Sequence, residues 1–540
     1  MNAATEIALH AHDRILDFLR RIDPLLLTSA TALSTYSIIY LWNLHTDDIG
    51  IRRRLARQFF SLIRAFSFVK KRINNEIIKA EESLHKTIHE HNGDQLFLTK
   101  IPTEAIDSDS LIQLIESYDS LEGPRYLEGK VSGAVFNDEK DMEEMKVYEE
   151  VFRKFAWSNP LWPKLFPGVR KMEAEVVRMC CTLMHGDEKS CGTMSTGGTI
   201  SILLACLAHR NRALKNGVLF PEMIIPSSAH AAFTKAGEVF RIRVVQIPVD
   251  PKTFKVDLKK MKSAISRRTC MLVGSAPNFP FGTVDDIVEI GKLGLSNNIP
   301  VHVDACLGGF LLPFVDAPPF DFRVPGVISI SADTHKYGLA PKGSSVILYK
   351  NKDYLHNQYF CDADWQGGIY ASSTLEGSRS GLNIALCWAS LLFHGIEKYE
   401  KHAQAVVETT KKIRDGIRAM PELRLQGESD LCIVSWSSDT LDIHRLYDLI
   451  GKRGWQLTNL QFPSGIHIMV TSNHTKDGVV GQLLEDIRKS INEILANPNA
   501  ELEEAAALYG MAQKIPDRSI VKEFAYIYLD ACYSAPKQTK

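Results

Sequence analysis

Short apolar runs alternate with longer segments of helical periodicity beyond about residue 100. The runs are rich in Val and Ile, which favours buried strands, and the segments between them include predicted helices at 200–215 and 285–296. Strands that alternate with helices in this way are typical of a mainly parallel sheet covered on both faces, so the pattern predicts an α/β fold. The predicted strands are 223–225, 243–247, 271–273, 300–303 and 327–330.

The same pattern divides the chain into four regions. Residues 1–50 form a tail that contains an uncharged window, and residues 51–110 form a basic helical connector. The large α/β domain covers 111–395, and a smaller α/β domain with a C-terminal tail covers 396–540. A chain of 540 residues therefore accommodates one large enzyme subunit with appendages.

The uncharged window at 24–44 is as long as a helix that crosses a bilayer. Arginines and lysines follow it between Ile51 and Arg72, where no acidic residue occurs. By the positive-inside rule, this asymmetry predicts a single transmembrane helix with the catalytic part on the cytosolic side. Hydroxyl side chains dilute the window, so a buried or surface helix is the alternative. Residues 51–69 have amphipathic spacing, which suits a helix on the membrane surface or one packed on the domain.

Composition and charge exclude several classes of protein. Hydrophobic residues make up 45% of the chain and charged residues 24%, which excludes a disordered or collagen-like chain. The 63 basic residues balance 64 acidic residues, so no global positive field attracts nucleic acid. The ten cysteines show no repeated C-x-x-C pairing, which argues against a zinc site and a disulfide framework. Reduced thiols in the cytosol fit this pattern.

The segment Ser-Ala-Asp-Thr-His-Lys-Tyr-Gly at 331–338 follows a predicted buried strand. A lysine cation is costly to bury, so a lysine in such a place tends to be deprotonated or used covalently. Lys336, preceded by His335, therefore has the setting of an amine that forms a Schiff base with pyridoxal 5'-phosphate (PLP). Upstream, Asp304 ends another predicted strand at the carboxyl edge of the sheet, where ligands bind. Its carboxylate can pair with the pyridine nitrogen of PLP.

Two further motifs support the PLP interpretation. Gly197, Gly198 and Thr199 precede a predicted helix, so their backbone amides and the helix N-terminus suit a phosphate group. His230 follows the predicted strand at 223–225, and its imidazole is a candidate to stack on the cofactor ring. Each motif alone has a commoner structural explanation, but their joint occurrence favours a PLP site.

The order of these motifs resembles the sphingosine-1-phosphate lyase family over nearly the whole chain. Further matching segments are 155–160, 320–323, 340–343, 364–370 and 509–512. The resemblance implies the fold-type I architecture of PLP-dependent transferases, as in aspartate aminotransferase. It also implies a homodimer with shared active sites and a single-pass anchor in the endoplasmic reticulum membrane, with the catalytic domain facing the cytosol. The large domain at 111–395 is then the PLP-binding domain.

The resemblance also implies individual roles. Lys336 matches the lysine that binds PLP, Asp304 the pyridinium partner and His230 the stacking residue. Lys342 matches a lysine near the substrate phosphate, and residues 377–379 match a loop that approaches the neighbouring subunit's cofactor. The predicted cofactor-binding set is Lys336, Asp304, His230, Gly197, Gly198, Thr199, His335 and Ser378, and the predicted substrate-binding set is Lys342, Phe136 and Trp162.

Several positions depart from the family pattern. Phe136 replaces a tyrosine and Trp162 a histidine, which would remove two contacts to the substrate phosphate at about 1.5 to 3 kcal/mol each. Ile200 replaces a glutamate, Phe281 a histidine and Glu376 a small residue. The departures are expected to cluster at the site. A carboxylate at Glu376 would repel nearby phosphates unless it points away or finds a cation, and a solvated loop residue is the alternative.

The activity implied by the resemblance is cleavage of sphingosine-1-phosphate, or a related phosphorylated long-chain base, to a fatty aldehyde and phosphoethanolamine. A PLP-dependent amino-acid decarboxylase is one alternative, because it shares the fold and the His–Lys motif. A PLP-binding paralogue with weak or no lyase activity is another, and the departures at Phe136 and Trp162 motivate it.

Overall fold

The computed structural model describes residues 23, 25, 28–29, 31–37, 59, 66–90, 97–121, 123–124, 126–137, 141–429, 431–498 and 518–536. The chain divides into two compact units, Met1–Leu62 and Ile63–Lys540, and all three sheets of the described residues belong to the second. Much of the predicted membrane span at 24–44, and most of the amphipathic segment at 51–69, lies outside the described residues. Among the residues described, no helix combines the length and the apolar content that crossing a membrane requires.

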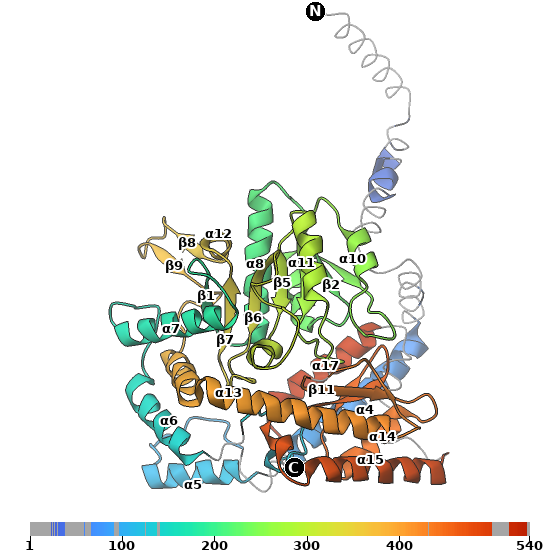
Figure 1. Ribbon diagram of the computed structural model, residues 1–540. Helices are drawn as coiled ribbons and strands as arrows, with labels where there is room; N and C mark the ends of the chain where they lie inside the picture. Colours follow the sequence, from blue (N-terminus) through green and yellow to red (C-terminus); the bar gives the residue numbers. More distant parts are fainter. Residues whose placement is uncertain are drawn as a thin grey trace, which may run out of the picture. The chain divides into compact units, whose positions relative to one another are not determined.

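A seven-stranded sheet forms the centre of the second unit, with the strand order β1-β7-β6-β5-β4-β2-β3 (Figure 1). Neighbouring strands from β3 to β6 pair in parallel, whereas β7 pairs antiparallel with both β6 and β1. The five predicted strands are confirmed. The strands are β1 (Cys191–Ser195), β2 (Glu222–Pro226), β3 (Arg243–Ile247), β4 (Thr269–Ser275), β5 (Val301–Asp304), β6 (Val327–Ala332) and β7 (Ser345–Tyr349).

Helices cover both faces of this sheet because alternate residues of its strands point to opposite sides. In β2, Ile224 joins one apolar cluster while Met223 and Ile225 join another. The first cluster includes side chains of α7 (Pro167–Leu183) and α11 (Ile287–Ser296), and the second includes side chains of α8 (Gly198–Lys215) and α9 (Ala231–Phe240). The predicted helices at 200–215 and 285–296 correspond to α8 and α11. A further helix, α10 (Leu258–Ala264), follows β3.

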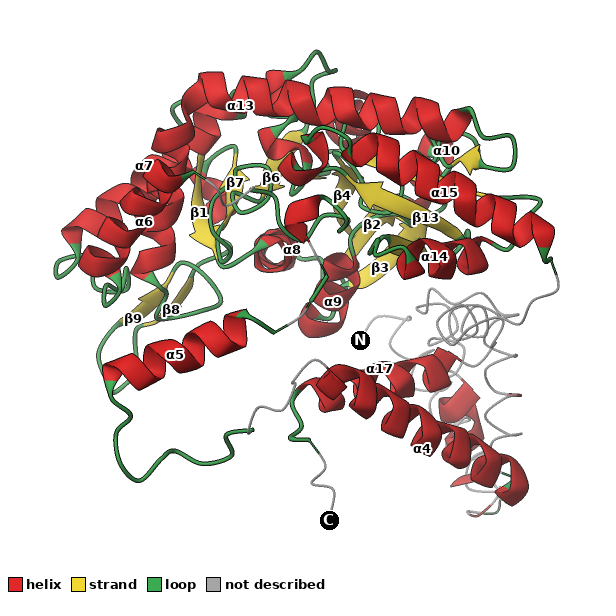
Figure 2. Cartoon of the chain, turned by 90° about the horizontal axis from the view of Figure 1, so that it is seen from below, coloured by secondary structure: helices red, strands yellow, loops and turns green. Residues whose placement is uncertain are grey.

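A smaller antiparallel sheet with the order β10-β11-β13-β12 forms the C-terminal part. The long helix α13 (Gly381–Arg418) leads into it and kinks at Gly395, where φ is 59°, so the predicted domain boundary between 395 and 396 falls on the kink (Figure 2). Trp436 and Ile466 share one apolar cluster with Val303 of β5, which joins the two sheets through a common core. The elements are β10 (Arg424–Leu425), β11 (Ile433–Ser437), β12 (Thr458–Leu460), β13 (Gly465–Met469), α14 (Ile443–Lys452) and α15 (Val479–Ala496).

The remaining elements flank these two sheets. The helices α4 and α17 lie side by side (Figure 2), and His89 Nε2 lies 3.3 Å from Ser534 Oγ just beyond α17. A two-stranded sheet, β8 with β9, precedes the loop that leads into α13. The elements are α4 (Ser67–His89), α5 (Ser108–Asp119), α6 (Met142–Phe155), α12 (Lys352–Leu355), β8 (Phe360–Asp362), β9 (Tyr370–Ser372) and α17 (Arg518–Cys532).

Candidate active site

A tight, buried turn after β6 positions Lys336. The Thr334 carbonyl accepts a hydrogen bond from the Ala340 amide at 3.1 Å, and a Cβ on Gly338 would lie 2.4 Å from the same carbonyl oxygen. Glycine is therefore required at position 338. The fully buried Tyr337 donates a hydrogen bond to the Val470 carbonyl at 2.6 Å. The main chain on both sides of Lys336 is thus fixed by contacts with the large and the small domain.

Asp333 is the partner of Lys336. The distance from Lys336 Nζ to Asp333 Oδ2 is 2.9 Å, and the Asp333 side chain is buried. Burial alone would lower the pKa of Lys336, but Asp333, with further contributions from Cys306 and Asp304, outweighs this effect and raises the pKa above its ordinary value. Asp333 therefore stabilises the ammonium form of Lys336. The other oxygen, Asp333 Oδ1, is buried and accepts no hydrogen bond from the described residues.

Asp304 lies at the carboxyl end of β5, in register with Ser331 of the neighbouring strand β6. Its Oδ1 accepts hydrogen bonds from the Cys306 amide at 3.1 Å and from Ser331 Oγ at 3.4 Å. Because β5 and β6 are parallel neighbours, Asp304 and the turn that carries Lys336 emerge at the same edge of the sheet.

A buried polar network lies behind Asp304. His302 Nε2 lies 3.3 Å from Ser331 Oγ, and His302 Nδ1 lies 2.9 Å from Ser329 Oγ. The same Ser329 oxygen lies 2.8 Å from Nε2 of His209 on α8. Burial lowers the pKa of both His209 and His302 to about 3, so both rings are neutral at neutral pH. The network thus links helix α8 through β6 to the Asp304 carboxylate without introducing a second charge.

The Gly-Gly-Thr turn packs directly on Asp333. It connects β1 to α8, whose N-terminus has no side-chain cap. A Cβ on Gly198 would lie 2.6 Å from Asp333 Oδ2, and a Cβ on Gly197 would lie 3.5 Å from His335 Cε1. The absence of a side chain at Gly198 therefore brings the turn, including Thr199, against the Asp333–Lys336 pair.

His335 and His230 make different contacts: His335 lies near Asp333, whereas His230 caps a helix. His335 Nε2 lies 3.9 Å from Asp333 Oδ2, and burial lowers the pKa of His335 although Asp333 opposes this effect. His230 lies at the carboxyl end of β2 and caps α9, because its Nδ1 accepts a hydrogen bond from the Ala232 amide at 3.2 Å. His230 therefore shares the sheet edge with Asp304, and its stacking role stays a prediction.

The predicted substrate residues lie in two places. Lys342 Nζ lies 4.9 Å from the centre of the Phe136 ring, and this ring packs edge-on against Tyr337 with a centroid distance of 4.9 Å. Burial and the charge of Lys336 lower the pKa of Lys342. Lys342 and Phe136 therefore adjoin the Lys336 turn. Trp162, in contrast, is 61% exposed on the turn between α6 and α7.

Besides Phe136, which belongs to the main apolar core, two more of the departures are packed in apolar surroundings. Phe281 is buried against Phe254, with ring centroids 4.6 Å apart, and against Leu460. The structure thus places the Phe281 ring in a hydrophobic cluster rather than a polar site. Ile200, in the first turn of α8, packs against an apolar cluster that includes Tyr349. The expectation that the departures gather at the site therefore needs correction for Phe281, whose ring fills part of the core.

The loop at 376–379 contacts the turn after β1, the segment before α7 and α7 itself. Glu376 Oε1 accepts a hydrogen bond from Thr196 Oγ1 at 2.8 Å, so this carboxylate faces the Gly-Gly-Thr turn. Ser378 Oγ accepts a hydrogen bond from Asn159 Nδ2 at 3.0 Å. Arg379 forms a bidentate ion pair with Glu173 at 2.6 and 2.9 Å. Glu376 is half-buried and accepts a hydrogen bond from Thr196, so it is not the fully solvated loop residue that the sequence allowed as an alternative.

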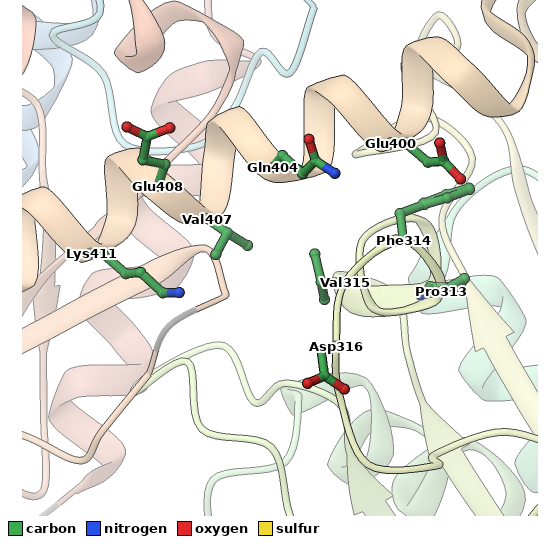
Figure 3. Close-up of a pocket in the computed structure, with 9 residues that line it drawn as sticks. All are labelled: Pro313, Phe314, Val315, Asp316, Glu400, Gln404, Val407, Glu408 and Lys411. Atoms are coloured by element: carbon green, nitrogen blue, oxygen red, sulfur yellow. The ribbon is translucent and has the colours of Figure 1, made fainter.

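A separate cavity of about 470 Å³ lies between α13 and the loop at 313–316 (Figure 3). None of the predicted cofactor or substrate residues lines it, so it is not the site formed around Lys336. Its lining consists of Pro313, Phe314, Val315, Asp316, Glu400, Gln404, Val407, Glu408 and Lys411.

The residues at the sheet edge fit PLP. The uncapped N-terminus of α8 at Gly198 suits a phosphate, and Asp304 is placed for a protonated ring nitrogen. The unpaired Asp333 Oδ1 leaves a buried acceptor beside the Lys336 amine.

Asp333 and His302 were not predicted as site residues. His302 precedes Asp304 by two positions on one strand, so their shared face was the signal in the sequence.

Comparison with known proteins supports the same cofactor, PLP, as the geometry of the site. Residues 159–438 match the family model for the pyridoxal-dependent decarboxylase conserved domain. The chain is 42% identical over 522 residues to the sphingosine-1-phosphate lyase of Drosophila melanogaster, covering 96% of this chain and 95% of the relative. It is 41% identical over 526 residues to sphingosine-1-phosphate lyase 1 of Rattus norvegicus, covering 96% and 92%.

Solved structures give the same result. A sphingosine-1-phosphate lyase from Burkholderia pseudomallei superposes with a TM-score of 0.75 at 35% identity, covering 83% of this chain and 99% of that chain. A glutamate decarboxylase from Lactobacillus brevis has a TM-score of 0.66 at 19% identity, covering 76% of this chain and 98% of that chain, and shows the shared fold alone. The chain therefore belongs to the sphingosine-1-phosphate lyase family, with the α/β fold of PLP-dependent decarboxylases and PLP as its cofactor.

Proposed function

We propose that this protein cleaves sphingosine-1-phosphate, or a closely related phosphorylated long-chain base, into a fatty aldehyde and phosphoethanolamine. The observation that carries the proposal is the convergence of Lys336, Asp304 and the Gly198 turn at one sheet edge, in a chain whose relatives are named for this reaction. The amino-acid decarboxylases share the fold at much lower identity and give no support for a decarboxylation reaction here.

The roles of the site residues follow from their positions. When bound, PLP supplies an electron sink that allows a carbon–carbon bond next to the substrate amine to break. Lys336 would hold the cofactor through its amine, Asp304 would pair with the ring nitrogen, and the Gly197–Thr199 turn would bind the phosphate. Asp333 keeps a proton on Lys336 and thereby controls when this amine becomes nucleophilic.

Lys342 is the residue best placed to bind the substrate phosphate. Its ammonium group lies over the Phe136 ring, next to the Lys336 turn, and the ring offers no hydroxyl. The phosphate contact therefore depends on the Lys342 charge more than it would with a tyrosine at position 136. We therefore expect the substrate phosphate to bind more weakly than it would with tyrosine at position 136. The phenylalanine should not change the residues that bind PLP.

Product analysis tests this function. Purified protein is loaded with PLP and incubated with sphingosine-1-phosphate, and separately with glutamate and with an aromatic amino acid. The fatty aldehyde and phosphoethanolamine are expected from the lipid, with no carbon dioxide from either amino acid. Carbon dioxide without lipid cleavage would overturn the proposal in favour of a decarboxylase.

We further propose that the protein is a homodimer whose active sites lie at the subunit interface. Apolar side chains on the surface of α5, α6 and the segment after α6 support this, because they would be buried by a second copy. Asn159, in that segment, bonds Ser378 of the loop beside the cofactor turn. The exposed side chains include Ile112, Ile115, Phe152, Trp157, Trp162 and Leu165. Light scattering should give twice the mass of one chain, and a monomer at micromolar concentration would contradict the dimer.

Finally, we propose a single-pass anchor in the endoplasmic reticulum membrane with the catalytic domain in the cytosol. The uncharged window at 24–44 and the basic run after it support this topology. The long alkyl chain of the substrate would reside in the same membrane. Full-length protein should resist extraction by alkaline carbonate, whereas a chain that begins after residue 62 should be released. Release of the full-length protein would refute the anchor.

A further inference from the structure

The Gly-Gly-Thr turn has an internal anion beside it. Glu376 Oε1 accepts a hydrogen bond from Thr196 Oγ1 at 2.8 Å, directly before Gly197 and Gly198. The second oxygen, Oε2, is buried and accepts no hydrogen bond from the described residues. The first turn of α8 contains no acidic residue of its own, and the Asp333 carboxylate packs against Gly198, so Glu376 supplies a second carboxylate beside this helix N-terminus.

A carboxylate and a phosphate bind to such a turn through the same interactions. Both are anions that accept hydrogen bonds from backbone amides and hydroxyls, and both are stabilised by the partial positive charge of a helix N-terminus. A phosphate that binds beside Glu376 would meet like charge in a partly desolvated place. The loop that carries Glu376 is also held in position, because Thr374 Oγ1 donates to the Glu376 carbonyl at 3.0 Å and Arg379 pairs with Glu173.

We propose that Glu376 competes with the phosphate of PLP for the Ser195–Thr199 turn and thereby lowers the affinity of this protein for its cofactor. Binding of the phosphate requires the Glu376 side chain to leave Thr196, so the bond between Thr196 and Glu376 opposes cofactor retention. This inference rests on the turn being the phosphate site. It concerns PLP affinity alone and does not depend on which substrate is cleaved.

The test compares cofactor affinity in matched variants. Glu376→Gln removes the charge but keeps an oxygen that can accept the Thr196 hydrogen bond, and Glu376→Ala removes both. Glu397→Gln changes an exposed carboxylate on α13, which pairs only with Lys401 in the described part of the chain, and serves as the control. Dissociation constants for PLP and for pyridoxal, which lacks the phosphate, are measured by absorbance titration after the cofactor is removed by dialysis.

Glu376→Gln and Glu376→Ala should each bind PLP about five-fold more tightly than the parent protein, since a like charge at about 4 Å contributes roughly 1 kcal/mol even in water. Pyridoxal affinity and the Glu397→Gln variant should not change. Unchanged or weaker PLP binding in both Glu376 variants would overturn the proposal. So would an equal gain for pyridoxal, because Glu376 would then act on the loop and not on the phosphate.

Discussion

Asp333 is the main group that favours the protonated form of Lys336. Burial lowers the proton affinity of this amine, and Asp333 at 2.9 Å, together with Cys306 and Asp304, more than reverses this effect. Asp333→Asn should therefore lower the pKa of Lys336 and increase the fraction of nucleophilic amine at neutral pH. The rate at which added PLP gives its visible absorption band, measured against pH, should reach its plateau at lower pH in the variant. An unchanged pH profile would show that Asp333 does not control the amine.

Among the residues that depart from the family pattern, Phe136 is the one that lies against Lys342. Phe136→Tyr places a hydroxyl on the ring below the Lys342 ammonium group, within reach of a phosphate that this lysine binds. One charge-assisted hydrogen bond of about 1.5 kcal/mol should lower KM roughly ten-fold for sphingosine-1-phosphate with little effect on kcat. Phe281→Tyr is the matched control, because Phe281 is equally buried but packs against Phe254 and Leu460 rather than under Lys342, and it should leave KM unchanged. Equal effects of both variants would contradict this assignment.

Some residue roles were readable from the sequence and others were not. Lys336, Asp304 and Gly198 were predicted from their positions at strand ends and before a helix, and the structure brings their segments to one edge. Asp333 was visible only as part of the lysine motif, because its pairing depends on how the turn after β6 folds. The direction of the Glu376 side chain depends on a contact with a residue 180 positions away in the sequence, which no local pattern encodes.

At the scale of elements, the turn before α8 depends on close packing. Gly198→Ala would put a methyl group 2.6 Å from the Asp333 carboxylate, so the turn must move away from Lys336. PLP affinity should fall by more than ten-fold, because phosphate binding needs the amides in place. Gly481→Ala, in α15, is the control since a Cβ there meets nothing within 4 Å, and it should keep its PLP affinity. Retained affinity in Gly198→Ala would mean that the turn does not hold the phosphate.

Four buried histidines make the fold sensitive to acid. Burial lowers the pKa to about 3 for His209 and His302 and to about 4 for His467 and His474. Their unfolded pKa is near 6.5, so the unfolded chain takes up protons first as pH falls. Each histidine then lowers the free energy of unfolding by about 1.4 kcal/mol per pH unit between roughly pH 6 and the folded pKa.

The carboxyl group of Asp285 has the opposite effect on stability as the pH falls. Burial raises the pKa of Asp285 to about 6, so its protonation stabilises the fold as pH falls from 6 towards 4. Four histidines outweigh this one group. Urea unfolding at pH 7 and pH 5 should give a clearly lower free energy of unfolding at pH 5, and equal values would contradict neutral burial of the four rings.

Strands β2 to β6 were predicted from the sequence, whereas β1 and β7 were not. Strands β2 to β6 are apolar runs between helices, and their parallel order follows from that alternation. Strand β1, with the sequence Cys-Gly-Thr-Met-Ser, lacks such a run, and its Gly192 is needed because a Cβ would lie 2.2 Å from the Ile347 carbonyl oxygen. Its pairing with β7 joins segments about 150 residues apart, so it depends on tertiary contacts that local periodicity does not report.

At the scale of the whole molecule, the two sheets share one core, and the active site lies where both contribute contacts. Tyr337, next to Lys336, bonds the Val470 carbonyl beyond β13. The smaller domain thus helps to fix the lysine that the larger domain supplies.

The measurement that tests the central claim most directly is the yield of both products from sphingosine-1-phosphate. The PLP-loaded parent protein should release fatty aldehyde and phosphoethanolamine in equal amounts, because one carbon–carbon bond is broken for each substrate molecule. Lys336→Ala, handled in the same way, should release neither product and should show no visible absorption band of bound PLP. Absence of both products from the parent protein, or equal yields from Lys336→Ala, would contradict the assignment of this chain as a lyase that works through Lys336.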